Sequence, residues 1–181
     1  MKKILSLFVA SILLTGCETG ELLNTPTKKV EMFLGNYQTL NSNVIEQLDD
    51  VVENETTFDD NQKETYRDIM KNHYKNLTYE IKDEIIDGDM ATVTVEIEVT
   101  DYTKVMTDAE QYKTDNPNEF NNAEGTYDES LFTNYRLENL KNAKDKVKYT
   151  IDFTLTKNDD EWELEPLTEE QESKIHGLYI Y

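Results

Sequence analysis

Few residues in this chain could do chemistry at neutral pH. There is one cysteine, Cys17, and there are two histidines, His73 and His176. The sequence has no Gly-x-Ser-x-Gly turn, phosphate-binding loop, His-Glu-x-x-His helix or paired-cysteine metal motif. These groups are the usual means of nucleophilic, phosphoryl-transfer or metal-dependent catalysis. The sequence therefore favours a non-catalytic protein, and we expect no cofactor and no metal ion.

Cys17 ends a segment that has the order of a secretory signal. Lys2 and Lys3 give a basic start, an apolar run covers residues 4–14, and Leu-Thr-Gly stands directly before the cysteine. The run is shorter than the roughly 20 apolar residues that a membrane span needs. The segment resembles the bacterial lipoprotein signal. The resemblance implies removal of residues 1–16 and transfer of a diacylglyceryl group to the thiol of Cys17.

The same resemblance implies a location. A Cys17 that carries palmitate-type acyl chains would anchor the protein to the outer face of the cell membrane, because two acyl chains bind a bilayer stably and one does not. The resemblance favours a membrane of the Gram-positive type. Residues 17–25 would then be a polar tether. The alternatives are an ordinary secretory signal with an incidental cysteine, and an uncleaved buried helix. The expected partners are the membrane, through the lipid on Cys17, and an envelope protein or a small ligand.

The chain is strongly acidic. It has 38 Asp and Glu against 18 Lys and Arg, and removing residues 1–16 takes away two lysines and no acids, so the formal charge falls to −22. Phosphate backbones need a basic surface, so we expect no nucleic-acid partner. Repulsion also disfavours flat adsorption on anionic lipid. The charge suits solubility and is compatible with a cationic partner.

The two histidines allow different interpretations. His73 lies on the apolar stripe of a predicted helix, where it could be a ligand-binding group or general base, or else a core histidine with satisfied hydrogen bonds. His176 stands beside Gly177, the predicted C-cap of a short last helix, where a cation would interact well with the helix end. His73 is the weak candidate for a ligand-binding residue.

Aromatic and acidic residues form two further groups. The predicted core-facing aromatics could line a pocket for a sugar or aromatic ligand, or pack the core. These are Tyr37, Tyr66, Tyr74, Tyr79, Tyr149 and Trp162. The acidic clusters at 87–89 and 159–161 lack the Asp-x-Asp-x-Asp-Gly spacing of a calcium loop, and turn chemistry accounts for both.

The elements that position these residues follow from periodicity. Apolar residues at helical spacing predict helices within 26–37, 44–52 and 66–77, and alternation predicts strands at 77–86, 91–100, 147–156 and 161–165. A helical insertion is expected at 103–145, covering a sheet face or projecting as a lid. We predict one α+β domain over 26–181, with N-terminal helices against an antiparallel sheet and the insertion between two hairpins.

Three short motifs connect this order to a known fold. Thr25-Pro26 leads into Val30-x-x-Phe33, an alternating strand follows Gly88-Asp89, and Lys157-x-Asp159 precedes Trp162-x-Leu164. Over residues 26–166 the chain resembles the nuclear-transport-factor-2-like fold, also called SnoaL-like or cystatin-like, and its uncharacterised Gram-positive lipoprotein members. The resemblance implies a strongly bent, cone-like sheet that often encloses a pocket. A fold alone does not specify a function.

Overall fold

The computed structural model describes residues 23–180. The signal peptide, Cys17 and most of the predicted tether lie outside the described residues, as does Tyr181. The predictions of cleavage and lipidation therefore remain predictions.

Three helices open the described chain: α1 (Pro26–Gln38), α2 (Ser42–Asn54) and α3 (Asp60–Lys75). The first begins as its sequence predicts. The Thr25 hydroxyl accepts a hydrogen bond from the Lys28 N–H, and a proline occupies the first turn. The start of α1 is thus fixed by local capping.

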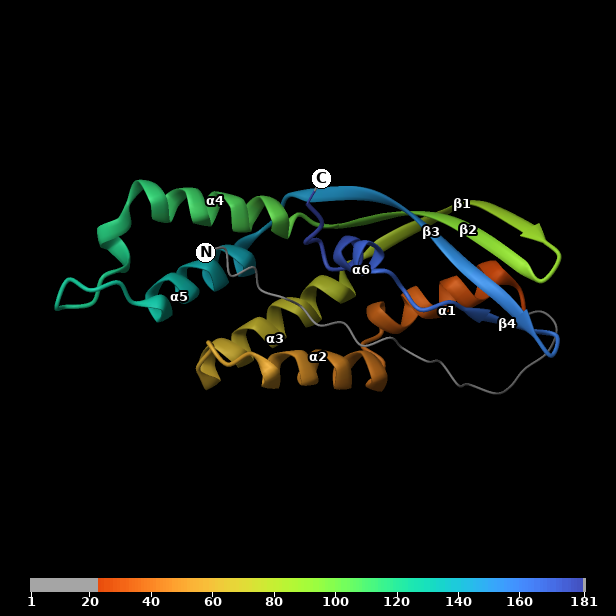
Figure 1. The fold of residues 1–181 in the computed structure, drawn as a ribbon, viewed down its shortest axis with the longest axis horizontal. Coiled ribbons are helices and arrows are strands. Elements are labelled where there is room, and N and C mark those ends of the chain that lie inside the picture. Colours follow the sequence, from red (N-terminus) through yellow and green to blue (C-terminus); the bar gives the residue numbers. More distant parts are fainter. Residues whose placement is uncertain (1–22, 181) are drawn as a thin grey trace.

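The four strands of the described residues form one antiparallel sheet in the order β1-β2-β3-β4 (Figure 1). They are β1 (Thr78–Asp87), β2 (Met90–Thr100), β3 (Lys146–Asn158) and β4 (Glu161–Leu164). β2 pairs with β3 along its whole length, from Met90↔Thr156 to Thr100↔Lys146. The sheet is therefore built around the central β2–β3 pair.

Both predicted hairpin turns are present. Gly88 has φ +61°, and Asp159 and Asp160 have φ +48° and +67°. Left-handed backbone of this kind suits tight two-residue turns, and glycine, aspartate and asparagine adopt it most readily. Turn geometry accounts for these acidic clusters, as the sequence indicates.

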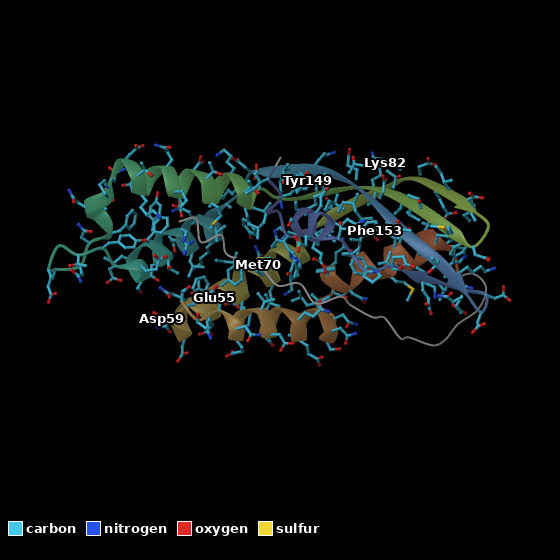
Figure 2. The ribbon with its side chains drawn as sticks, viewed as in Figure 1. Glu55, Asp59, Met70, Lys82, Tyr149 and Phe153 are labelled. Atoms are coloured by element: carbon cyan, nitrogen blue, oxygen red, sulfur yellow. The ribbon has the colours of Figure 1, made fainter. Side chains whose placement is uncertain are left out.

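One face of the sheet carries the core. Alternate residues of β2 and β3 are buried against the helices, and Phe33 of α1 meets Phe153 of β3 edge to face, with ring centroids 5.9 Å apart. Met70 and Phe153 lie toward this interior, whereas Lys82 lies on the outer surface of β1 (Figure 2). Burial on one face and polar residues on the other are what period-two alternation predicts.

The insertion between β2 and β3 comprises α4 (Tyr102–Asp115), a 3₁₀ turn η1 (Pro117–Phe120) and α5 (Glu129–Asn142). α4 and α5 lie side by side beyond one end of the sheet, opposite the end with the β1–β2 turn (Figure 1). They pack on each other and α5 packs on α3, with a small second core of Ala109, Phe120 and Phe132. Of the two expected arrangements, projection is the one observed.

The last helix, α6 (Glu169–Ile175), covers the side of β3 that lies beyond its short pairing with β4. Gln171 Nε2 donates to the Asp152 carbonyl at 2.6 Å, and Lys174 Nζ donates to the Thr150 carbonyl at 3.1 Å. The predicted capping box of Thr168 and Gln171 is present. Side chains of α6 thus occupy backbone groups that β3 would otherwise leave to solvent.

The opposite edge, β1, is uncovered. Within residues 23–180 its backbone pairs with β2, and no helix or further strand adds a backbone hydrogen bond to its outer side. Its only interruption is a register shift between Ile81 and Asp83. β1 therefore presents an open strand edge.

The predicted α+β class, the N-terminal helices and the helical insertion are confirmed. Among the described helices, none is both long enough and apolar enough to span a bilayer.

Candidate functional site

His73, the residue that the sequence singles out, lies inside the core. It is 2% exposed, and its Nε2 lies 2.9 Å from the Ile175 carbonyl oxygen of α6. A carbonyl only accepts, so Nε2 carries the proton and donates. Burial lowers the pKa of His73 to about 4, so the ring is neutral at pH 7. In this position His73 connects α3 to the C-terminal helix.

His176 makes a second connection between the same two helices. Its Nδ1 shares a hydrogen bond of 3.1 Å with the Tyr74 hydroxyl. The prediction of a cation at this helix end is wrong, because burial lowers the pKa of His176 to about 3. The neutral imidazole serves as a hydrogen-bonding core residue.

The backbone completes the attachment of the C-terminal segment. Gly177 has φ +69°, and the N–H groups of Gly177 and Leu178 donate to the carbonyls of Lys174 and Ser173 in a Schellman motif. The Gly177 carbonyl accepts from the N–H groups of Tyr102 and Thr103, both at 3.0 Å. A Cβ at residue 177 would lie 2.1 Å from the Thr100 carbonyl oxygen and 3.1 Å from His73 Cε1. Only glycine fits this approach.

The tyrosines around His73 are packed core residues. Burial raises the pKa of Tyr37, Tyr66 and Tyr74 above the usual range and that of Tyr102 to about 12. A hydroxyl with a raised pKa is a poor base or nucleophile at neutral pH. The packing interpretation holds for all the predicted core-facing aromatics. Tyr79, near the start of β1, is half-buried and packs at the boundary of the core.

Two polar atoms in this region have no hydrogen-bond partner among the described residues. They are the Tyr66 hydroxyl oxygen and His73 Nδ1, both fully buried. Buried polar atoms are normally hydrogen-bonded, so these two atoms are exceptions within the described core. The two residues lie on the same stripe of α3, two turns apart.

One carboxylate lies close to the same segment. Glu172 of α6 is 5% exposed, and burial raises its pKa to about 7, with repulsion from Glu169 adding to the shift. Within residues 23–180, no group of three His, Cys, Asp or Glu side chains is arranged to hold a metal ion. The buried region can therefore respond to pH, but its described residues offer no arrangement for metal chemistry.

A second region, at the β1–β2 turn, has the opposite character. Three large apolar side chains are exposed there: Ile85 by 60%, Ile86 by 53% and Met90 by 56%. We call Ile85, Ile86 and Met90 the hairpin tip. The register pairs Ile85 with Thr92 and Ile86 with Ala91, so Ile85 and Met90 lie on the outer face of the sheet and Ile86 lies on the face that carries Ala91. Exposed apolar side chains at one end of a sheet are candidates for an interaction site. Periodicity alone did not identify this group, because an Ile-Ile pair in a strand looks like core.

No family model matches the chain, and no curated protein matches it. Among solved structures, the crystal structure of a "putative lipoprotein" (ycdA) from Bacillus subtilis is similar, with a TM-score of 0.46 and 16% identity over 78% of this chain. This match covers 47% of the Bacillus chain, so the present chain spans about half its length. A similarity at this level does not establish a shared family or function.

Proposed function

We propose that this protein is a non-catalytic binding module, exported and held on the outer face of the cell membrane by lipid on Cys17. A Gram-positive envelope and a nuclear-transport-factor-2-like domain are part of this proposal. The signal-like segment supports the anchoring, and the proposed partner is a protein of the envelope.

The exposed hairpin tip carries the binding role. Leaving an apolar side chain such as Ile86 in water, instead of burying it, costs about 25 cal/mol per Å² of apolar surface. The tip lies in an acidic chain of formal charge −20, where polar residues are abundant. The buried histidines, in contrast, are occupied in holding α6. Exposed apolar side chains at the hairpin tip suit protein binding better than catalysis.

Two variants test anchoring and binding separately. Cys17→Ser in the full chain should move the protein from the membrane fraction to the soluble fraction. A photo-crosslinking residue at Ile86 should give crosslinks to an envelope protein in cells, and one at Leu131 serves as the control. Leu131 is 40% exposed and lies on α5, at the other end of the molecule. Membrane retention of Cys17→Ser would contradict the anchor, and equal crosslinking from both positions would contradict the binding role.

The unpartnered buried atoms favour a second candidate, a small-molecule-binding protein or enzyme that uses His73. A small polar ligand could supply the hydrogen bonds that His73 Nδ1 and the Tyr66 hydroxyl lack. Native mass spectrometry of the protein purified from cells should then show added mass that is lost in His73→Phe. A spectrum that contains only the polypeptide and its lipid would rule this candidate out.

A further inference from the structure

The hairpin tip belongs to a strand whose backbone is available on one side. Asp87 pairs with Met90 across the two-residue turn. The residues next to such a turn form a hydrogen-bonded pair, and the residues between successive hydrogen-bonded pairs direct their N–H and C=O groups away from the partner strand. Glu84 and Ile86 therefore direct backbone groups to the open side of β1. The Glu84 N–H donates to Asp83 Oδ1 at 2.9 Å, so the groups left for a partner are the Glu84 carbonyl and the N–H and carbonyl of Ile86.

Natural proteins usually protect such an edge with a lysine, a bulge or a covering element. β1 has the first two at one place only, where Lys82 lies within the register shift between Ile81 and Asp83. The charge of Lys82 is already paired, at 2.6 Å from Glu80 and 3.6 Å from Glu96. The half of β1 nearest the turn has neither device.

The charge around this half is negative. Residues 78–90 contain five acids and one lysine. Glu84 Oε2 accepts from the N–H and hydroxyl of Thr27, at 2.9 and 2.7 Å. Asp83, Asp87 and Asp89 form no ion pair with any residue in the described range 23–180. The edge is thus apolar at its side chains and acidic around them.

We propose that the open edge of β1 binds an extended, basic segment of a partner protein as a fifth strand of the sheet. This inference rests on the proposed binding role and specifies its partner. The Glu84 carbonyl and the N–H and carbonyl of Ile86 supply the backbone pairing, and the hairpin tip contacts apolar side chains. The carboxylates that form no ion pair attract lysine or arginine.

The same charges disfavour a second copy of this chain as the occupant. Antiparallel pairing of two β1 edges would set Asp83 and Asp87 of one copy near the acids of the other. Like charges opposite each other destabilise a strand pair. A basic strand meets no such repulsion.

Peptide selection tests the chemistry of the partner. The full-length chain in detergent is used to select binders from a random ten-residue peptide library. We expect enrichment of peptides with lysine or arginine alternating with apolar residues. Enrichment of acidic peptides, or of no basic ones, would overturn the proposal.

Backbone methylation then tests the mode of binding. N-methyl groups at alternate amides of a selected peptide block one edge of a strand, so the affinity should fall at least about tenfold, the equivalent of 1.4 kcal/mol. Unchanged affinity would show that the peptide does not add as a strand.

Matched variants locate the site. Asp83→Asn with Asp87→Asn should weaken binding of the selected peptide about fivefold, by removing two attractive charges. Glu64→Gln with Glu124→Gln removes two charges elsewhere and should change it little. Ile85→Thr with Ile86→Thr should also weaken binding, whereas Met32→Thr, at a residue 52% exposed on α1, should not. Equal effects from test and control variants would contradict the location.

Two further outcomes separate this inference from the proposed function. The first is binding to phosphatidylcholine vesicles by the Cys17→Ser variant, which has no lipid of its own. If this binding is lost when Ile85→Thr and Ile86→Thr are added, the hairpin tip contacts a lipid surface and strand addition is overturned. Crosslinks from Ile86 in cells without selection of basic peptides would leave the binding role intact and refute the basic strand.

Discussion

The two edges of the sheet are treated differently. On one side, the part of β3 that extends beyond β4 is covered, because the carbonyls of Thr150 and Asp152 accept hydrogen bonds from side chains of α6. At β1, no element of the described chain does the same. An uncovered edge is a template for pairing with another chain. In this fold, a helix covers exposed strand backbone on one side of the sheet, and the backbone on the other side is uncovered.

The covered edge depends on residues distant in sequence. His73 and Ile175 are separated by 102 positions, and so are Tyr74 and His176. The open edge depends on a local hairpin. Variants that detach α6 should therefore reduce global stability, and variants at the hairpin tip should not. Five predictions test this difference.

Gly177→Ala should have the largest effect, because the new Cβ would overlap the Thr100 carbonyl while the backbone holds a positive φ. We expect the free energy of unfolding to fall by about 4 kcal/mol. Gly125→Ala is the control, since φ there is +79° but nothing lies within 4 Å. It should cost about 1 kcal/mol in urea denaturation. Equal losses would mean that close packing of α6 is unimportant.

Acidification should weaken the same attachment. Unfolded histidine titrates near 6.5, whereas His73 and His176 have pKa values of about 4 and 3. The contribution of each neutral histidine to the free energy of unfolding is complete above pH 6.5. It is lost as the pH falls toward 4, by up to about 3 kcal/mol for each histidine.

Glu172 acts in the opposite direction. Its pKa is raised from 4.5 to about 7, so its contribution is complete below pH 4.5 and is lost as pH rises through 7. Glu172→Gln removes this opposing effect. The variant should be more stable than the native chain at pH 8, and its stability should fall more steeply between pH 7 and pH 4. Parallel stability curves of the two proteins would contradict this assignment.

Lys174→Met tests the edge contact itself. The substitution keeps the aliphatic stem but removes the hydrogen bond to the Thr150 carbonyl and the ion pair with Glu170. We expect a loss of about 1 kcal/mol in thermal unfolding. Lys75→Met, at an exposed end of α3, should stay within about 0.5 kcal/mol of the native chain. An unchanged Lys174→Met variant would show that the cover contributes nothing to stability.

Ile85→Thr with Ile86→Thr should have the smallest effect, within about 0.5 kcal/mol, because both side chains are already exposed. Ile97→Thr makes the same chemical change at a residue with 0% exposure and should cost at least about 2 kcal/mol. A large loss from the double variant would indicate that the hairpin tip is structural and would count against a binding role.

Local signals in the sequence predicted most of the fold. Thr25 and Pro26 marked the first helix, alternation marked β2 and β3, and Gly177 marked the end of α6. The capping box of Asp59 and Gln62 has an equally local signal and was missed. Each of these features is decided by neighbours within a few residues.

The candidate site was less predictable, because its properties arise from contacts between distant segments. His73 was placed on a buried stripe, but nothing near it in sequence indicates that Ile175 accepts its hydrogen bond. The helix end alone predicts a cationic His176. Burial by Tyr74 and its neighbours keeps the imidazole neutral instead. The exposed Ile85 and Ile86 resemble core residues until the strand order places β1 at an edge.

The start of the described chain has a consequence for how the domain would sit in the envelope. Asn24 donates to the Asp160 carbonyl at 2.6 Å and accepts from the Trp162 N–H at 2.9 Å, which fixes it at the β3–β4 turn. That turn lies at the same end of the sheet as the β1–β2 turn, since the Lys157 N–H donates to the Asp89 carbonyl at 2.8 Å. Cys17 is seven residues before Asn24, a reach of at most about 25 Å. If Cys17 carries a lipid, this short tether would favour one orientation of the domain. The strand turns would lie near the bilayer, and α4 and α5 would face away from it.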